Sequence, residues 1–291
     1  MPELPEVETV RTGLSELLPG RVFSAVDSNW TKSFSASKKE ANQFLVGAKV
    51  LAIRRRAKVI IIDLSSGYSL VIHLKMTGQL VFRSDKQKFG AGHPTDSLVG
   101  ELPDKSTRVI FDFKDGSKLF FNDQRKFGWI KLVATSKIEE IDFFKKVGPE
   151  PLSGGFKSAD FISRMRRRNN SGIKSVLMDQ SVVAGVGNIY ADESLFAAKI
   201  HPSTRVAKVT DSQLSTLYAQ LRKILQLSIR KGGSTDRNYV DAKGNRGNYL
   251  KFAKVFRREG QSCPRCGAAI IKTKVAGRGT HICPVCQVEV K

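Results

Sequence analysis

The pattern of hydrophobic and polar positions divides the chain into a β-rich first part and a helical second part. The stop signal Pro19-Gly20 ends a first helix, which is expected to begin at about residue 6. Short apolar runs separated by turn signals such as Ser66-Gly67 then predict strands at 50–53, 58–64, 69–74, 108–113 and 118–121. This spacing favours an antiparallel sandwich or flattened barrel over βαβ units. The polar, glycine-bearing stretch 84–104 is expected to be a mobile excursion.

Helical periodicity begins after residues 134–157, which are interpreted as a linker because of their glycines and prolines. Helices are expected at 159–168, 173–178, 189–198 and 211–231, the last with a stripe of leucines and isoleucines. Residues 232–250 are rich in glycine, asparagine and serine, which is typical of a flexible loop. The predicted domains are therefore a β-domain at 1–133, a helical domain at 158–255 that carries this loop, and a small module at 256–291.

The charge balance narrows the class of partner. The 291 residues are 41% hydrophobic and include 49 Lys and Arg against 27 Asp and Glu, a net charge of +22. Such an excess predicts salt-sensitive binding to a polyanion, either nucleic acid or an acidic membrane surface. The longest strongly apolar run, Val59-Ile60-Ile61-Ile62, is far too short to span a bilayer. Since the first residues are acidic and show no secretory signal, a cytoplasmic, nucleoid-associated protein without a membrane partner is expected.

Four cysteines at the end of the chain have the spacing of a metal site. Cys263 and Cys266 form one CxxC pair, and Cys283 and Cys286 form a second after sixteen residues. Two such pairs present four thiolates to the corners of a tetrahedron, which predicts one structural zinc with no open position for catalysis. The stretch between the pairs is expected to form a hairpin with Gly277-Arg278-Gly279 at its tip. Arg278 there is suited either to clamp a phosphate or to be a solvated turn residue.

The first residues carry a possible nucleophile. Removal of Met1 leaves Pro2 with a secondary α-amine, which is partly unprotonated at neutral pH. Such an amine can attack an electrophilic sugar carbon and collapse directly to an iminium. Glu3, one residue away, is suited to act as an acid or base. The alternative is that the prolines and glutamates simply form a turn and start a helix.

Two further groups of residues are suited to hold DNA. Gly185 to Tyr190 precede a predicted helix, and Asn188 there is expected to cap that helix at a phosphate site, with Lys174 on the other side. An ordinary helix start has the same pattern. Met76 and Phe127 are each next to a strand end and suited to wedge into a base stack, with Arg125 beside Phe127. Core packing is the alternative for both.

These segments, in this order, resemble the bacterial formamidopyrimidine-DNA glycosylases over essentially the full length. The resemblance rests on the opening string MPELPEVET, the segments 73–78 and 122–128, the stretch 172–195 and the paired cysteines. It implies an α+β multidomain fold. The parts are an N-terminal catalytic antiparallel β-sandwich with a leading helix, a helix-two-turn-helix domain with a lesion-capping loop at 232–250, and a C-terminal zinc-finger β-hairpin.

The resemblance also implies roles for single residues. Pro2 is the nucleophile and Glu3 assists ring opening; Lys58 and Arg278 assist elimination and hold phosphates. Met76, Arg125 and Phe127 fill the void left by an everted base, and Lys174 and Asn188 contact the lesion-side backbone. The capping loop contributes Ser234, Thr235 and Tyr239. Ser106 departs from the family, because many members carry a DNA-contacting histidine there.

The implied function is base-excision repair by a bifunctional glycosylase and abasic-site lyase. Its substrate is double-stranded DNA with oxidised purines, such as 8-oxoguanine, or with abasic sites. A monomer that needs no cofactor beyond one structural zinc is expected. Three alternatives stay open: a glycosylase for oxidised pyrimidines, a catalytically inert damage-binding protein that retains Met1, and a zinc-ribbon RNA-binding protein.

Overall fold

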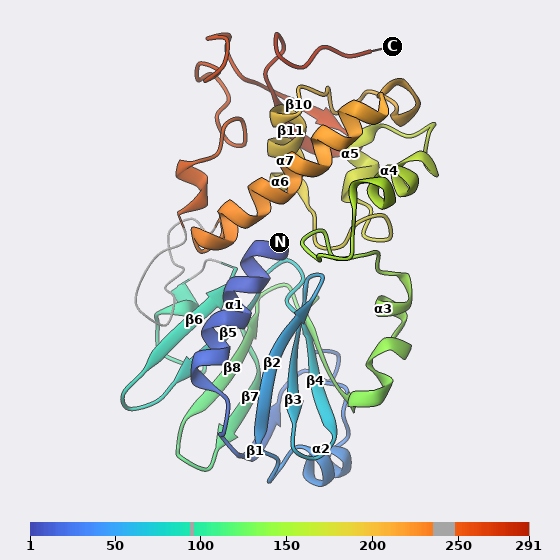
Figure 1. Ribbon diagram of the computed structural model, residues 1–291. Coiled ribbons are helices and arrows are strands. Elements are labelled where there is room, and N and C mark those ends of the chain that lie inside the picture. The colour runs from blue at the N-terminus through green and yellow to red at the C-terminus, as the bar shows by residue number, and fades with distance from the viewer. Residues whose placement is uncertain (94–95, 235–247, 291) are drawn as a thin grey trace. The chain divides into compact units, whose positions relative to one another are not determined.

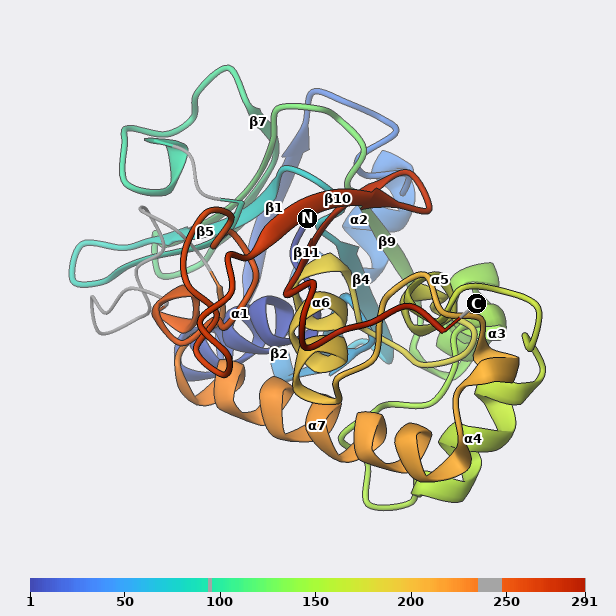
Figure 2. The same cartoon turned by 90° about the horizontal axis from the view of Figure 1, so that it is seen from above.

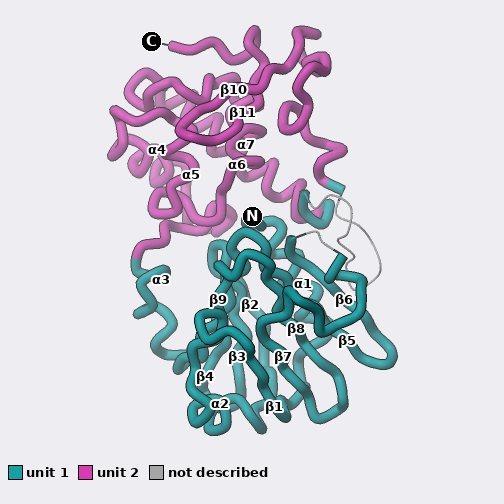
Figure 3. Tube along the Cα trace, turned by 180° about the vertical axis from the view of Figure 1, so that it is seen from behind, with its two compact units in different colours: residues 1–145, 231–248 teal, residues 146–230, 249–291 magenta. Residues whose placement is uncertain are grey.

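The computed structural model describes residues 1–93, 96–234 and 248–290. The chain forms two compact units, one of residues 1–145 with 231–248 and one of residues 146–230 with 249–291 (Figure 3). The first boundary falls inside the predicted linker 134–157, which contains the 3₁₀ helix η2 (Thr135–Glu140) and the short helix α3 (Asp142–Lys146). Residues 231–248 group with the first unit, which differs from their expected place in the helical domain.

Two antiparallel sheets and a leading helix build the first unit (Figure 1). One sheet has the order β1 (Phe23–Ser28), β7 (Thr107–Phe113), β8 (Lys118–Asp123), β5 (Gly78–Arg83), β6 (Lys88–Gly92). The other has the order β2 (Val50–Arg56), β3 (Val59–Leu64), β4 (Tyr68–His73), β9 (Trp129–Ala134). Helix α2 (Lys38–Phe44) and the 3₁₀ helix η1 (Asp96–Leu98) lie in the connections. Apolar residues from both sheets share one core, so the predicted sandwich is confirmed.

Helix α1 (Leu4–Leu17) closes the sandwich between the edge strands of the two sheets. Its buried stripe, which includes Val7, Val10 and Leu14, belongs to the same core as the strands. The helix packs against β2 and against β6, which are edge strands of the two different sheets. The fit is close, because a Cβ at Gly13 would lie 2.3 Å from the ring of Phe89 on β6. A covered edge cannot pair with another chain.

The stretch 84–104 is not simply the excursion expected from its polarity, because it contains β6. This strand pairs with β5 from Gln79↔Gly92 to Arg83↔Lys88. The glycines of β6 lower its strand propensity, so the sequence pattern did not predict this strand. They are required by close packing, since a Cβ at Gly92 would lie 2.4 Å from the carbonyl oxygen of Gly78. Strands β1, β5 and β9 were likewise absent from the predicted set.

The second unit is helical and ends in a two-stranded hairpin. Its helices are α4 (Ser158–Arg166), α5 (Ile173–Met178), α6 (Asn188–Ala197) and α7 (Asp211–Arg230), with 3₁₀ helices η3 (Val206–Lys208) and η4 (Tyr249–Lys251). All four α-helices were predicted to within two residues of these bounds. Helix α7 packs along α6 and α4 through its buried leucines (Figure 2). Strands β10 (Ile271–Val275) and β11 (Arg278–Ile282) form the hairpin. No helix in the described ranges is both long and apolar enough to cross a bilayer.

Candidate active site and nucleic-acid interface

The proposed nucleophile Pro2 and its neighbour Glu3 come immediately before the first turn of α1. Pro2 is buried and Glu3 is 3% exposed, whereas Met1 is 45% exposed. Glu3 is the N-cap of the helix, and its N–H donates to Oε2 of Glu6 at 2.9 Å. This is the capping-box geometry that starts helices. The interpretation as a helix start is therefore correct, and the same geometry fixes the backbone next to Pro2.

Lys58 lies in the tight turn between β2 and β3, where Arg56 pairs with Val59. Arg55 ties this turn to α1: its Nη1 donates to the carbonyl of Ala57 at 2.7 Å, and its Nε donates to Oε2 of Glu8 at 2.7 Å. Lys58 itself is 4% exposed. Helix α1, which follows Pro2 and Glu3, is therefore linked through Arg55 to the carbonyl of Ala57, the residue before Lys58.

His73 is a candidate site residue to which the sequence reading assigned no role. It ends β4 and pairs in the ladder with Val59, the residue after Lys58. Burial, together with the positive charges of Lys75 and Lys58, lowers the pKa of His73 to about 3. Its Nδ1 accepts the N–H of Lys75 at 3.0 Å. A neutral imidazole at neutral pH therefore lies close to Lys58. In the sequence, only the place of His73 at a strand end could have indicated it.

Protonation of His73 is expected to destabilise the first unit in acid. The unfolded histidine binds a proton below about pH 6.5 and the folded one only near pH 3, so stability is lost as the pH falls between these values. The expected loss is about 2 kcal/mol between pH 7 and pH 5. In the variant His73→Asn, whose amide oxygen can still accept the N–H of Lys75, this part of the pH dependence is expected to disappear.

Urea unfolding followed by tryptophan fluorescence measures this, because both tryptophans, Trp30 and Trp129, lie in the first unit. The variant His201→Asn, in the second unit, is the control and should keep the wild-type pH slope. Equal slopes for wild type and His73→Asn would contradict the prediction.

The three proposed void-filling residues lie on two loops that one carboxylate joins. Asp123 is 0% exposed and ends β8. Its Oδ1 accepts the hydroxyl of Thr77 and the N–H of Arg125, and its Oδ2 accepts the N–H of Gly128 at 2.6 Å. Thr77 follows Met76, and Gly128 follows Phe127. The sequence analysis assigned no role to Asp123, although this residue lies in the segment 122–128 that carries the resemblance.

The side chains on these loops point outward, in agreement with the wedge interpretation rather than core packing. Met76 is 39% exposed and Phe127 is 54% exposed. The guanidinium of Arg125 lies 4.9 Å from the centre of the Phe127 ring, where a cation–π interaction holds the two together. An exposed methionine and phenylalanine at one end of a sandwich have no role in its core.

A left-handed residue precedes three of the candidate site residues. Ala57 before Lys58 has φ 53°, Lys75 before Met76 has φ 50°, and Lys126 before Phe127 has φ 59°. This conformation costs about 1 kcal/mol or more for a residue with a side chain. Such strain persists where the surrounding structure fixes it, and it is concentrated at functional sites.

Removal of the Asp123 carboxylate is expected to destabilise the first unit and loosen both loops. In Asp123→Ala, the hydroxyl of Thr77 and the N–H of Gly128 lose their buried acceptor, while the N–H of Arg125 keeps Thr77 Oγ1 at 3.0 Å. We therefore expect the free energy of unfolding to fall by about 3 kcal/mol. Tryptophan fluorescence in urea measures the change. The control is Asp112→Ala, which removes a half-buried carboxylate paired with exposed Lys118 and should change stability by less than about 0.5 kcal/mol. Similar losses in both variants would refute this role for Asp123.

The start of the predicted capping loop is tied to α1. The N–H and the hydroxyl of Ser234 both donate to Oε1 of Glu6 at 2.8 Å, and Ser234 is 9% exposed. Glu6 thus contacts both Glu3 and Ser234. Thr235 and Tyr239 lie outside the described residues. Ser106, the departure from the family, is buried and bonded to Asp104 at 2.7 Å.

Lys174 and Asn188 lie next to the hairpin of the second unit. Lys174, in the first turn of α5, is 1% exposed and its Nζ donates to Thr280 Oγ1 at 2.6 Å. Asn188 is not the cap of α6, as was predicted; Gly187 has that position, and Asn188 is the first helical residue. Its Nδ2 instead donates to the carbonyl of Gly279 at 3.0 Å. Asn188 thus binds a carbonyl 91 residues away along the chain and does not cap α6, contrary to the prediction from the local sequence.

Arg278 begins β11 and pairs with Val275 across the hairpin. The two turn residues are Ala276 and Gly277, both with positive φ, as in the twisted turns that suit hairpins. Arg278 is therefore beside the turn and not at its centre, a small correction to the expected tip. It is exposed, as a residue that binds phosphate must be.

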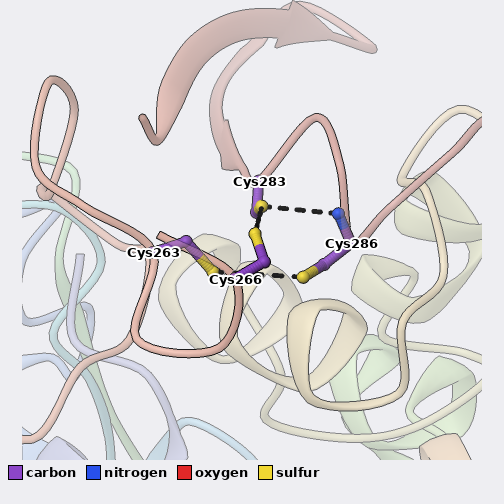
Figure 4. Close-up of side chains that lie close together, drawn as sticks. All are labelled: Cys263, Cys266, Cys283 and Cys286. Carbon is purple, nitrogen blue, oxygen red and sulfur yellow. Dashed lines mark hydrogen bonds between the residues drawn. The ribbon is translucent and has the colours of Figure 1, made fainter. Parts of the chain in front are cut away.

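The four cysteines converge as their spacing predicts (Figure 4). Their sulfur atoms all lie within 4.8 Å of one another, with Cys266 Sγ 3.4 Å from Cys283 Sγ and Cys263 Sγ 4.0 Å from Cys286 Sγ. Tetrahedral zinc–thiolate bonds of about 2.3 Å require sulfur separations of about 3.8 Å. The N–H groups of Arg265 and Cys286 point at the sulfurs of Cys263 and Cys283, both at 3.4 Å. The donor set therefore fits one structural zinc ion.

Comparison with known proteins agrees with this arrangement. The formamidopyrimidine-DNA glycosylase N-terminal domain matches residues 1–130, the H2TH domain of the same enzymes matches 147–239, and a zinc finger found in FPG and IleRS matches 260–288. The fold and these matches define the class: DNA glycosylases with a helix-two-turn-helix domain and a zinc finger.

Full-length relatives define the family. The chain is 40% identical to the formamidopyrimidine-DNA glycosylase of Pelotomaculum thermopropionicum, covering 99% of both chains. It is 41% identical to that of Streptococcus pyogenes, covering 99% of this chain and 98% of the relative. Among solved structures, Lactococcus lactis Fpg in complex with abasic-site DNA has a TM-score of 0.87 at 34% identity, covering 99% and 100% of the two chains. The chain belongs to the formamidopyrimidine-DNA glycosylase family.

Proposed function

We propose that the protein excises oxidised purines from duplex DNA and cuts the strand at the resulting abasic site through a Pro2 imine. One observation carries the proposal: Pro2 and Glu3 start a helix that is bonded, through Glu8 and Arg55, to the turn of a buried lysine. Solved relatives support the substrate class. They include a Lactococcus lactis Fpg mutant in complex with Fapy-dG DNA and MutM in complex with carbocyclic 8-oxo-G DNA.

The glycosylase step begins after Met1 is removed. The nitrogen of Pro2 attacks C1′ of the damaged nucleotide, and the bond from C1′ to the base breaks, so that the base leaves with the electron pair and takes up a proton. Glu3 delivers a proton to the ring oxygen as the bond from C1′ to that oxygen opens. The product is an iminium between Pro2 and C1′. A secondary amine forms this cation without losing a further proton, which suits proline to the task.

The lyase step uses the iminium as an electron sink. Loss of a proton from C2′ expels the 3′ phosphate by β-elimination, and loss of a proton from C4′ then expels the 5′ phosphate by δ-elimination. Lys58 assists these proton transfers, and Arg278 holds a phosphate next to the lesion. Water finally releases the sugar fragment and restores the amine. The zinc ion takes no part, because four cysteines complete its coordination.

The remaining residues hold and read the DNA. The net charge of +22 supplies salt-sensitive attraction to the backbone. Met76, Arg125 and Phe127 fill the space of the everted base, and Lys174 and Asn188 serve the lesion-side backbone. Ser234, Thr235 and Tyr239 belong to the loop that covers the base. We propose that the protein acts as a monomer in the cytoplasm, on the nucleoid.

Borohydride trapping tests the proposal. The protein is incubated with a duplex that holds one 8-oxoguanine opposite cytosine, and with matched duplexes that hold guanine or an oxidised pyrimidine. We expect a covalent adduct and cleavage with phosphates at both ends only with 8-oxoguanine. Preference for the oxidised pyrimidine would favour the alternative of a glycosylase for oxidised pyrimidines. Tight binding without an adduct would overturn the enzyme and leave a damage-binding protein, and binding to RNA alone would favour the zinc-ribbon alternative.

A further inference from the structure

A buried acid–base pair in the second unit has no part in the proposed chemistry. Asp192, in the middle of α6, is 0% exposed, and Lys174 on α5 is 1% exposed. Lys174 Nζ lies 2.6 Å from Asp192 Oδ1. Taking both charges out of water costs several kcal/mol per ion, and an apolar pair of the same volume is often as stable. Stability alone therefore does not explain this pair.

The ammonium of Lys174 directs its other protons to the hairpin. It donates to Thr280 Oγ1 at 2.6 Å and reaches the carbonyl of Gly279 at 3.5 Å. The Thr280 hydroxyl, 0% exposed, donates in turn to the carbonyl of Arg278 at 3.0 Å. An ammonium has three donors and no acceptor, and Asp192, Thr280 and Gly279 each offer it an acceptor.

Two further bonds hold the same strand. The N–H of His281 donates to Oδ2 of Asp192 at 3.0 Å, and Asn188 Nδ2 donates to the carbonyl of Gly279. Residues 278 to 281 are thus each bonded, directly or through one hydroxyl, to α5 or α6. All of these residues lie in the second unit.

The hairpin needs such support because it cannot fix Arg278 alone. Two isolated strands are marginally stable in water, and the first four residues of β10 are exposed. The zinc site holds the far end of β11, where Cys283 follows Ile282. At the near end, which carries Arg278, the Asp192–Lys174–Thr280 chain provides the support.

We propose that Asp192 is a positioning residue that holds Lys174 in place, so that Lys174 and Thr280 fix the backbone of Arg278 for phosphate binding. The inference rests on the proposed function, because it assumes that Arg278 binds DNA. It gives Lys174, 1% exposed, an internal role in place of the direct contact with the DNA backbone that the resemblance implies.

The test is a double-mutant cycle between Asp192 and Arg278, read as the affinity for a duplex with a reduced abasic-site analogue at several salt concentrations. We expect Arg278→Ala to weaken binding about tenfold and to lower the slope of log K against log salt by about 0.9, the loss of one phosphate contact. We expect the pair Asp192→Leu with Lys174→Met, which keeps the volume apolar, to do the same. In the Arg278→Ala background the pair should have no further effect.

Thr280→Val provides a second measurement if the pair variant is unstable, since it leaves Lys174 and Asp192 paired and removes only the hydroxyl. It should lower the salt slope in the same way. The matched control is Asp179→Asn at the end of α5, an acidic residue 3.6 Å from Arg168, which should bind as wild type does. Zinc content is measured for every variant to confirm that the finger is intact.

The outcomes distinguish the positioning role of Asp192 from the phosphate contact of Arg278. If Arg278→Ala weakens binding but the Asp192 and Thr280 variants do not, or if their effects simply add, the positioning role is overturned and the proposed function stands. If Arg278→Ala leaves affinity and slope unchanged, the assigned role of Arg278 fails, and the inference fails with it.

Discussion

Replacement of Pro2 by glycine is expected to abolish the trapped adduct on 8-oxoguanine DNA and to slow base release by about 100-fold or more. Glycine keeps an α-amine, but a primary one without the rigid ring, and its imine is an electron sink only while it stays protonated, whereas the proline iminium has no proton to lose. The change is confined to the first turn, where Glu3 and Glu6 still cap α1 through the backbone. Quench-flow release of the base and borohydride trapping measure the two effects.

Two further variants make this prediction specific. An alanine inserted between Met1 and Pro2 turns the proline nitrogen into an amide, so activity should be lost although every other residue is kept. Pro5→Ala, in the same turn, removes a proline without a nucleophilic role and should keep the adduct. If Pro2→Gly gives as much trapped adduct as the wild type, and the DNA maps to another residue, the nucleophile lies elsewhere.

Removal of the zinc ion is expected to unfold the hairpin module and to weaken DNA binding by about 100-fold. The module has a small core, formed by Phe196, Val255, Ile270 and two of the cysteines. Metal binding in such modules supplies about 10 kcal/mol or more of folding free energy. Without it, the hairpin that presents Arg278 is expected to unfold, and the phosphate contact proposed for Arg278 is lost with it.

Cys283→Ser and treatment with a strong chelator should give the same result, because Cys283 is buried in that core. Tryptophan fluorescence is the internal control, since both tryptophans lie in the first unit and their urea transition should not move. Binding is measured by fluorescence anisotropy on abasic-site DNA. Full loss of zinc with wild-type affinity would refute the dependence of binding on the finger.

The elements that the sequence predicted well are those with a strong local pattern. The apolar run of β3 and the leucine stripe of α7 were found because a buried strand and an amphipathic helix impose their own periods. Strand β6 was missed because Gly90 and Gly92 are there for close packing and not for strand propensity. The prediction that Asn188 caps α6 was wrong for a similar reason, because its side chain binds the distant carbonyl of Gly279.

By itself, the sequence determined the class of the two units, the cysteine ligands and the nucleophile candidate, because each depends on residue types at short spacing. Tertiary structure alone decided which carboxylates matter. Asp123 joins two loops, Glu6 reaches Ser234 across 228 residues, and the ammonium beside Asp192 reaches Thr280 across 106. In the sequence these acids resemble any others on a strand or helix. Only burial, which makes each unpaired charge or donor costly, requires the partners that give them their roles.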